Sequence, residues 1–214
     1  VQGTLNLLEA LKVLHNECAV VLVTSDKVYL NKEWHFGYRE NDILGGHDPY
    51  SSSKAATEIA IASWRSSFCG FGSHQKTNLS IATARAGNVI GGGDWAQDRI
   101  LPDAIRSLES SKPVLVRQPL SKRPWQHVLE PLGGYLCLAE RLLDGRGHLS
   151  PFAGAFNFGP LLDSNRSVQD LIEAVLEYWP GHWIDISASD TPHEAGFLHV
   201  NIDKSYHQLG WYPH

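Results

Sequence analysis

Residues 19–25 read Ala-Val-Val-Leu-Val-Thr-Ser, a continuous apolar and mostly β-branched run of strand length. A strand that is apolar on both faces suits a parallel sheet covered by helices on both sides. Apolar residues at helical spacing precede this run over 4–14 and follow it over 50–68, and a second strand is predicted at 79–85. The alternation predicts an α/β fold with a mostly parallel, doubly wound sheet.

The same alternation continues through the rest of the chain. We expect helices over 100–108, 131–143 and 168–178, and short strands at 114–116 and 156–158. Pro102 lies in the first turn of one of these helices, and Ser167 directly precedes another, which are common residues at helix starts. The sequence contains no internal repeat and no low-complexity tract.

The composition excludes several classes of protein. With 43% hydrophobic and 19% charged residues, the 214-residue chain can bury a substantial core. A net charge of −5 argues against a nucleic-acid partner, and no apolar run approaches the ~18 residues of a membrane span. The cysteines Cys18, Cys69 and Cys137 are odd in number and lack metal-site spacing. We therefore expect a cytoplasmic protein with reduced cysteines, no metal site and no membrane partner.

The start of the chain is unusual. The sequence contains no methionine, and a helical pattern begins at once after Val1 with no capping residue ahead of it. We expect the chain to be a fragment whose N-terminal part lies upstream.

Polar residues at the end of the first strand form a candidate site with the start of the next helix. Ser25, Asp26 and Lys27 follow the strand, where ligands of open α/β sheets bind. Tyr50 and Lys54 lie four residues apart and so share one helix face, where an ammonium group near a phenol favours the phenolate. This pairing predicts proton transfer by Tyr50. A Tyr-x-x-x-Lys spacing also occurs by chance, so an exposed Tyr beside an unrelated Lys is the alternative.

A glycine-rich turn, Gly-Gly-Gly-Asp at 91–94, follows the second strand. Its position after a strand is compatible with a phosphate-binding turn, and the alternative is a flexible strand-exit loop.

Together these motifs resemble the extended short-chain dehydrogenase/reductase family and, within it, the nucleotide-sugar 4,6-dehydratases. The resemblance covers nearly the whole chain. The blocks that carry it are 24–29 (Thr-Ser-Asp-Lys-Val-Tyr), 38–41, 48–51 with Lys54, 85–95, 123–131, 157–160, 192–195 and 209–211.

The resemblance implies an internal redox cycle with NAD that stays bound. Tyr50 would take the proton from the sugar 4-hydroxyl as hydride leaves C4, while Lys54 would hold the nicotinamide ribose and Ser25 would orient the 4-oxygen. Ser25, Tyr50 and Lys54 are thus expected to contact the cofactor as well as the substrate. Water would then leave across C5 and C6, with Asp26 protonating the departing 6-hydroxyl, before hydride returns to C6.

Lys27 departs from the pattern of the dTDP-glucose relatives, which have Glu at this position as the base for the C5 proton. A Lys accepts a proton only where it is neutral, so Lys27 is either a base or proton relay, or a cation that neutralises Asp26. The Ser-Asp-Lys order favours the branch of the family that acts on CDP-glucose over the 4-epimerases.

The resemblance also implies residues that hold the nucleotide sugar. Arg123 is the first candidate for the diphosphate and Arg99 the second, since Arg binds phosphate through two parallel hydrogen bonds. Asn88 and Asn157 match residues that bind the nucleotide sugar, and His193 is a further candidate. Arg123 could equally be a structural ion-pair residue.

The family pattern predicts two interleaved domains. We assign 1–91 and 123–160 to the C-terminal part of a Rossmann domain, and 92–122 and 161–214 to a smaller nucleotide-sugar domain. The family's Gly-rich NAD loop would lie upstream of Val1. Relatives commonly dimerise through the helix that carries Tyr50, so we expect a homodimer.

The expected function is the dehydration of CDP-glucose for deoxysugars of surface polysaccharides such as O-antigen. Two alternatives stay open. One is a dehydratase or epimerase acting on a dTDP-, UDP- or GDP-sugar. The other is a non-catalytic protein that only binds a nucleotide sugar.

Overall fold

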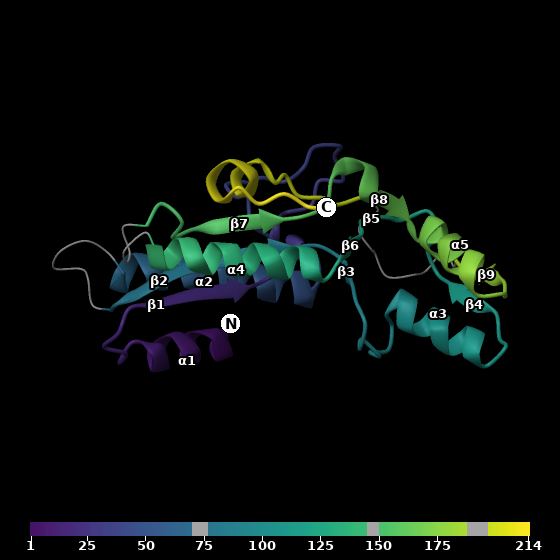
Figure 1. Ribbon diagram of the computed structural model, residues 1–214, viewed down its shortest axis with the longest axis horizontal. Helices are drawn as coiled ribbons and strands as arrows, with labels where there is room; N and C mark the ends of the chain where they lie inside the picture. The colour runs from purple at the N-terminus through teal and green to yellow at the C-terminus, as the bar shows by residue number, and fades with distance from the viewer. Residues whose placement is uncertain (70–76, 145–149, 188–196) are drawn as a thin grey trace.

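The computed structural model describes residues 1–69, 77–144, 150–187 and 197–214. The molecule is elongated, with a larger lobe built on a sheet at one end and a smaller lobe of helices and short strands at the other (Figure 1). The chain crosses between the lobes several times, so each lobe is assembled from separate parts of the sequence.

A parallel sheet forms the centre of the larger lobe. Its strands are arranged in the order β1 (Cys18–Val23), β2 (Leu79–Ala86) and β7 (Ala155–Phe158). Both pairs are parallel, with Cys18 opposite Leu79 and Thr83 opposite Ala155. The predicted parallel α/β arrangement is confirmed, and the apolar run that predicted it is β1.

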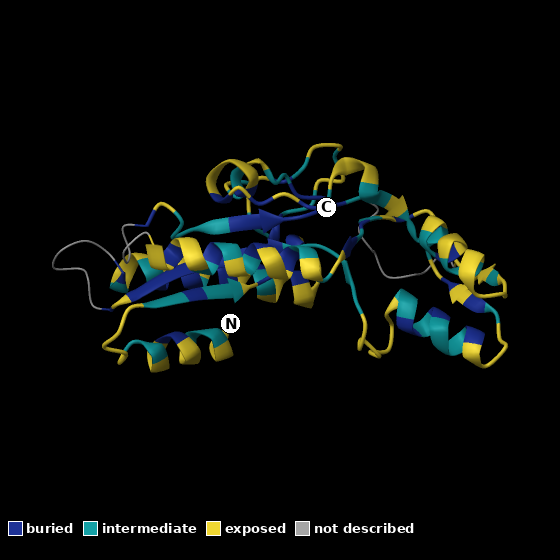
Figure 2. Cartoon of the chain, in the orientation of Figure 1, coloured by how far each residue is buried: buried dark blue, intermediate teal, exposed yellow. Residues whose placement is uncertain are grey.

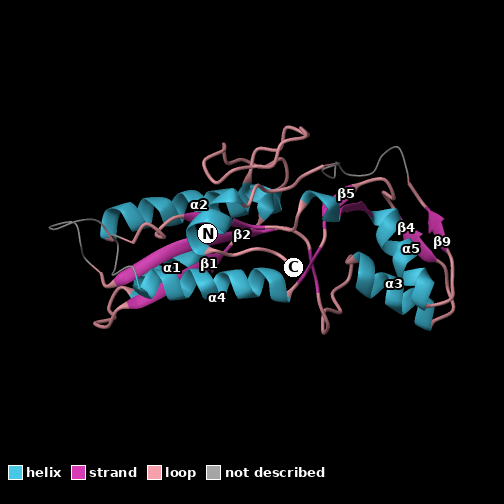
Figure 3. Cartoon of the chain, turned by 45° about the horizontal axis from the view of Figure 1, so that its top comes forward, coloured by secondary structure: helices cyan, strands magenta, loops and turns pink. Residues whose placement is uncertain are grey.

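Helices cover both faces of this sheet. Helix α4 (Leu129–Asp144) covers one face, and α2 (Pro49–Phe68) covers the other, with α1 (Gln2–Leu11) packed against α2 (Figure 3). Alternate residues of β2 therefore enter different cores. Ala82 and Ala84 pack with α4, whereas Leu79 and Ile81 pack with α1 and α2.

Helix α4 approaches the sheet unusually closely at one point. A Cβ atom on Gly134 would lie 2.4 Å from the ring of Phe158, so only glycine fits there. The aromatic rings of Tyr135 and Trp211 pack edge-on against the same phenylalanine, with centroids 5.3 and 5.1 Å away.

The smaller lobe has its own core. It contains α3 (Ile100–Glu109), β4 (Val114–Val116), α5 (Val168–Tyr178) and β9 (Trp183–Asp185), with β4 and β9 paired in parallel. Its buried residues are Ala104, Leu108, Val114, Val116 and Ile172. Ser167 begins α5 as predicted: its Oγ accepts a hydrogen bond from the backbone N–H of Asp170 at 3.0 Å.

Short strand pairs connect the two lobes. β3 (Val89–Ile90) runs parallel to β6 (Gln126–His127), and β5 (Lys122–Pro124) runs antiparallel to β8 (Asn165–Ser167). Three further single turns are η1 (Asp26–Val28), η4 (Leu162–Ser164) and η5 (Ser205–Leu209). None of these strands or turns was predicted from the sequence.

The end of the chain packs differently from the predicted domain assignment. The sequence analysis placed all of 161–214 in the smaller domain, but Leu209 and Trp211 belong to the core between the sheet and α4. Trp211 also donates from its indole Nε1 to the carbonyl of Glu130 at 3.2 Å. The reason is apolar burial: the large Trp211 side chain fills the space beside Gly134.

Helix α4 also carries an exposed leucine stripe, formed by Leu129, Leu132, Leu136 and Leu143 (Figure 2). These positions share one helix face, and the adjacent edge strand β1 has a partner on one side only within the described part of the chain. We predict that Leu136→Lys reduces concentration-dependent aggregation of the chain, because Leu136 is 73% exposed, and that the free energy of unfolding changes by no more than about 0.5 kcal/mol. Light scattering and urea titration measure the two effects.

Leu138 lies two residues further along α4 and faces the core, so it is the matched control for this test. It is fully buried, so Leu138→Ala should lower the free energy of unfolding by roughly 2–5 kcal/mol. If Leu136→Lys destabilised the protein as strongly, the stripe would be part of the core rather than a surface.

Candidate active site

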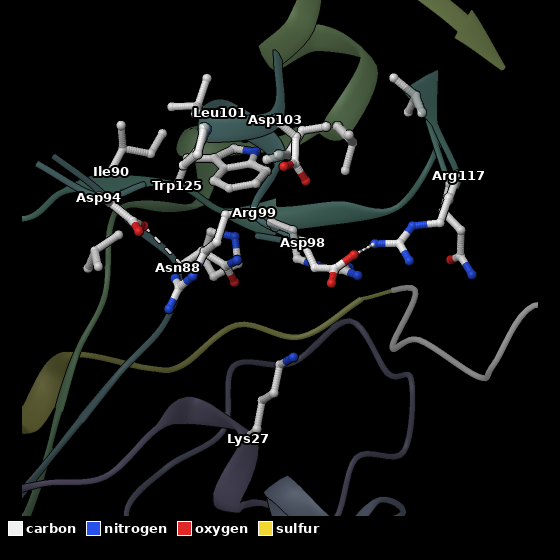
Figure 4. Close-up of a pocket in the computed structure, with 18 of the residues that line it drawn as sticks. Lys27, Asn88, Ile90, Asp94, Asp98, Arg99, Leu101, Asp103, Arg117 and Trp125 are labelled. Atoms are coloured by element: carbon white, nitrogen blue, oxygen red, sulfur yellow. Dashed lines mark hydrogen bonds and ion pairs between the residues drawn. The ribbon is translucent and has the colours of Figure 1, made fainter. Parts of the chain in front are cut away.

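A cleft of about 1220 Å³ lies between the two lobes. Its wall includes Asp26, Lys27 and Tyr50 from the larger lobe, and residues of α3 and β4 from the smaller one. Figure 4 shows Lys27 on one side of this cleft, and Arg99, Asp98 and Arg117 on the other. The carboxyl end of β1 opens into it, as expected for an open α/β sheet.

Ser25 and Asp26 lie directly after β1 and are both buried. Ser25 caps the single turn η1, because its Oγ accepts a hydrogen bond from the backbone N–H of Lys27 at 3.2 Å. The same hydroxyl donates to Asp26 Oδ1 at 3.1 Å. The turn therefore holds the serine hydroxyl and the carboxyl group side by side.

The Asp26 carboxyl is only 3% exposed, and its burial raises its pKa to about 6. The nearby charge of Lys27 and the hydrogen bond from Ser25 oppose this rise without cancelling it. A Cβ on Gly87 would come within 3.1 Å of Asp26 Oδ2, so the glycine leaves room for the carboxyl group. Asp26 can thus hold a proton near neutral pH.

Tyr50 occupies the first turn of α2 and is 51% exposed, at the wall of the cleft. Its position is set by Asp48, whose Oδ1 accepts hydrogen bonds from the backbone N–H groups of Tyr50 and Ser51 at 2.8 and 3.0 Å. Ser51 Oγ completes the capping box by accepting a hydrogen bond from the backbone N–H of Asp48 at 3.2 Å, and the same hydroxyl donates to Asp48 Oδ2 at 2.7 Å.

Two ammonium groups flank the Tyr50 ring. Lys54 Nζ lies 5.8 Å from the ring centroid, and Lys27 Nζ lies 6.0 Å from it. Both ammonium groups are thus within the distance at which a cation is attracted to an aromatic ring. The structure thus brings together Ser25, Asp26, Lys27, Tyr50 and Lys54, the five residues that the sequence analysis selected as catalytic candidates.

Of the predicted substrate-binding residues that the structure describes, three line the cleft and one does not. Asn88, Arg99 and Arg123 all line the cleft. Asn157 does not: it is fully buried, and its amide donates to the carbonyls of Tyr38 and Asn201 while accepting from Tyr29. No group of its side chain is left for a ligand, so we no longer consider Asn157 a substrate-binding residue. His193 lies outside the described residues.

Sequence reasoning missed several residues of the cleft wall. Arg117 forms an ion pair with Asp98 at 3.3 Å, and the backbone of Asp98 is left-handed, with φ of 61°. Trp125 also lines the cleft and donates from Nε1 to the carbonyl of Arg166 at 3.1 Å. These residues reach the cleft because of how the two lobes pack, and no local pattern in the sequence predicts that packing.

Within the described ranges, no helix is long and apolar enough to cross a membrane. The same residues contain no group of three or more His, Cys, Asp or Glu side chains placed to hold a metal ion.

The model of the NAD dependent epimerase/dehydratase family matches residues 1–149. The CDP-glucose 4,6-dehydratase of Salmonella typhimurium is 44% identical over 215 residues, which cover 100% of this chain and 59% of that protein. The chain thus spans about three fifths of the length of this curated relative.

Solved structures share the fold. The NAD complex of dTDP-glucose 4,6-dehydratase from Bacillus anthracis matches with a TM-score of 0.78 at 20% identity, over 100% of this chain and 62% of that one. UDP-glucuronic acid 4-epimerase from Bacillus cereus, in complex with UDP-glucuronic acid and NAD, matches with a TM-score of 0.78 at 17% identity, over the same shares of 100% and 62%.

The raised pKa of Asp26 predicts a pH-dependent stability. Between pH 3.8 and about 6 the folded state binds more protons at Asp26 than the unfolded state, so the free energy of unfolding should fall as pH rises through this window. The difference corresponds to on the order of 3 kcal/mol. Asp26→Asn should remove this part of the fall, measured by urea titration between about pH 4 and 7.5.

Comparing the variant with the unchanged protein isolates Asp26 from other carboxyl groups such as Glu40, whose pKa is also raised by burial. Superimposable pH profiles for the two proteins would show that Asp26 is not desolvated in solution.

Proposed function

Since the chain belongs to the NAD dependent epimerase/dehydratase family, we propose that the protein converts CDP-D-glucose to CDP-4-keto-6-deoxy-D-glucose by internal redox with NAD. The observation that carries this proposal is the cluster of Ser25, Asp26, Lys27, Tyr50 and Lys54, of which Asp26, Lys27 and Tyr50 line the cleft. The 44% identity to a CDP-glucose 4,6-dehydratase supports the choice of nucleotide sugar. The Asp26-Lys27 pair at the strand end supports elimination over epimerisation.

The residues at the start of α2 fit the nicotinamide end of NAD. Lys54 and Tyr50 present an ammonium and a half-exposed phenol on one helix face, and these groups suit the hydroxyls of the nicotinamide ribose. Ser25 follows β1 and caps the turn that carries Lys27, whose ammonium flanks the Tyr50 ring. When bound, NAD supplies the acceptor and later the donor of the C4 hydride.

In the proposed oxidation, Tyr50 accepts the proton of the sugar 4-hydroxyl. Lys54 and Lys27, each about 6 Å from the ring centroid, stabilise the negative charge of the phenolate that accepts it. The capping box of Asp48 and Ser51 fixes the backbone of Tyr50, so the phenol needs little reorganisation before it reacts.

In the proposed elimination, Asp26 donates a proton to the departing 6-hydroxyl. Its pKa of about 6 suits this step, because the carboxyl can both hold and release a proton near neutral pH. We propose that Lys27 balances the charge of Asp26 as the proton moves, since its ammonium lowers the pKa of Asp26 against the effect of burial. A second role for Lys27, as the base for the C5 proton, is tested by the product analysis described in the Discussion.

The substrate would lie along the cleft, with its sugar at Tyr50 and its nucleotide toward α3 and β4. Arg123 and Arg99 provide the positive charge that a diphosphate requires, and Asn88 provides an amide beside them. The charge of Arg123 is near enough to Asp26 to oppose, slightly, the rise in its pKa that burial causes. A diphosphate bound by Arg123 would therefore lie next to the reacting sugar.

Four further expectations stay predictions. We propose a homodimer formed through the exposed side of α2, on which Ile59 is 58% exposed. We propose that the two lobes correspond to a cofactor domain and a nucleotide-sugar domain, with the end of the chain joined to the former. Cytoplasmic localisation and a role in polysaccharide synthesis are proposed on the resemblance alone.

The catalytic proposal predicts the effect of Tyr50→Phe in the full-length protein. Removing the phenolic oxygen should lower kcat for CDP-glucose by roughly 10²–10⁴-fold, with a much smaller effect on KM, because the lost interaction is proton transfer. Tyr178→Phe is the matched control, since Tyr178 is exposed on α5 and does not line the cleft; it should leave kcat unchanged.

The same assay should include dTDP-, UDP- and GDP-glucose. Faster turnover of one of these would transfer the proposal to that nucleotide sugar. Full activity of Tyr50→Phe would contradict the assigned role, and binding without turnover of any sugar would leave only the non-catalytic function.

A further inference from the structure

A second, smaller cavity lies between α2 and the sheet. Its volume is about 320 Å³, and none of its lining residues lines the cleft. Helix α2 contributes Glu58, Ala62 and Arg65, strand β2 contributes Arg85, and Lys204 comes from the position just before η5. The cavity is therefore separate from the candidate active site.

The lining of this cavity carries more positive than negative charge. Its charged side chains are three cations and two carboxylates, namely Arg65, Arg85, Lys204, Glu40 and Glu58. Of the three cations, only Arg85 forms an ion pair within the described ranges, with Glu58 at 2.8 Å. Glu58 also accepts hydrogen bonds from Thr24 and Thr83, so its oxygens are already engaged.

The second carboxylate, Glu40, offsets the remaining charge only in part. Its Oε1 accepts a hydrogen bond from the backbone N–H of Asn157 at 2.9 Å, and burial raises its pKa. A carboxyl group whose burial disfavours the charged form is a weak counter-ion. Lys204 Nζ donates instead to the carbonyl of Ala155 at 2.7 Å, and Arg65 Nη1 donates to the carbonyl of Ile81 at 3.4 Å.

The three cations are close enough to act on one another. Burial lowers the pKa of Lys204, and the charges of Arg85 and Arg65 lower it further, against the effect of Glu40. Like charges that share a partly buried cavity repel each other more strongly than they would in water. An anion between them would relieve this repulsion.

Arg85 also provides a buried donor without a partner. Its side chain is only 4% exposed, and its two terminal nitrogens donate to Tyr29 and Glu58. Its Nε, in contrast, has no hydrogen-bond partner among the described residues. A buried donor left unpaired is unfavourable, so this N–H favours a ligand that can accept a hydrogen bond.

We propose that this cavity binds a small inorganic oxyanion such as phosphate. The guanidinium groups of Arg65 and Arg85 carry N–H donors that suit oxyanion oxygens, and Lys204 adds a third positive charge. A volume of about 320 Å³ is at the small end for ligand pockets, which suits an ion better than a nucleotide. The inference goes beyond the proposed function and uses no residue of the cleft.

The test adds a negative charge at the cavity without removing a buried contact. Ala62 is exposed and lines the cavity, so Ala62→Glu brings a carboxylate to it. Ser63→Glu is the matched control, because Ser63 is equally exposed on α2 and adds the same charge but does not line the cavity. Both positions neighbour Ile59 on the helix, so the two variants change the exposed side of α2 alike.

Thermal unfolding of the full-length protein is followed with increasing phosphate, and with chloride at the same ionic strength. Saturating CDP is present throughout to occupy the cleft. We expect phosphate to raise the Tm of the unchanged protein and of Ser63→Glu more than chloride does, because the anion binds the folded state. The apparent Kd for phosphate should rise at least about 10-fold in Ala62→Glu, through repulsion, and in Arg65→Gln, through the loss of a charged donor.

Two results would overturn the inference. One is a phosphate effect on the unchanged protein that is no larger than the effect of chloride. The other is an equal Kd for phosphate in Ala62→Glu and Ser63→Glu, which would place the bound phosphate outside this cavity.

Discussion

The buried ion pair between Arg85 and Glu58 is the interaction on which the active-site geometry depends. Arg85 Nη2 and Glu58 Oε2 are 2.8 Å apart, and the side chains are only 4% and 3% exposed. Two charges at this depth are costly unless hydrogen bonds surround them, and of the Arg85 nitrogens only the buried Nε lacks a hydrogen-bond partner among the described residues. Thr24 and Thr83 each donate to the same carboxylate, at 2.5 and 2.9 Å, which links β1, β2 and α2 at one point.

This connection positions the two halves of the candidate site. Thr24 directly precedes Ser25, and Glu58 lies one turn beyond Lys54 on α2. The ion pair therefore fixes the end of β1 against the helix that carries Tyr50. Arg85 extends the network by donating to the hydroxyl of Tyr29 at 2.9 Å, and Tyr29 donates to Asn157 at 2.6 Å. Asn157 is thus a structural link in the larger lobe rather than a residue that touches substrate.

Much of the larger lobe was predictable from local pattern. The apolar run at 19–25 and the helical spacing over 50–68 are local patterns, and β1 and α2 begin and end close to the predicted positions. Strands β5 and β8 are three residues each and pair across a long stretch of chain, so neither periodicity nor propensity reveals them. The role of Asn157 could not be predicted either, because the sequence does not distinguish an Asn that binds a ligand from one that binds backbone carbonyl groups.

The central claim is that the residues around Tyr50 and Asp26 eliminate water by an internal redox cycle. Its most direct test is the product that the full-length protein forms from C4-deuterated CDP-glucose, with an exchange arm in which unlabelled CDP-glucose is converted in heavy water. We expect loss of one water, transfer of the C4 deuterium to C6, and one solvent deuterium at C5 in the heavy-water arm. A product that retains its 6-hydroxyl, or one in which the label is lost from C4 without appearing at C6, would contradict it.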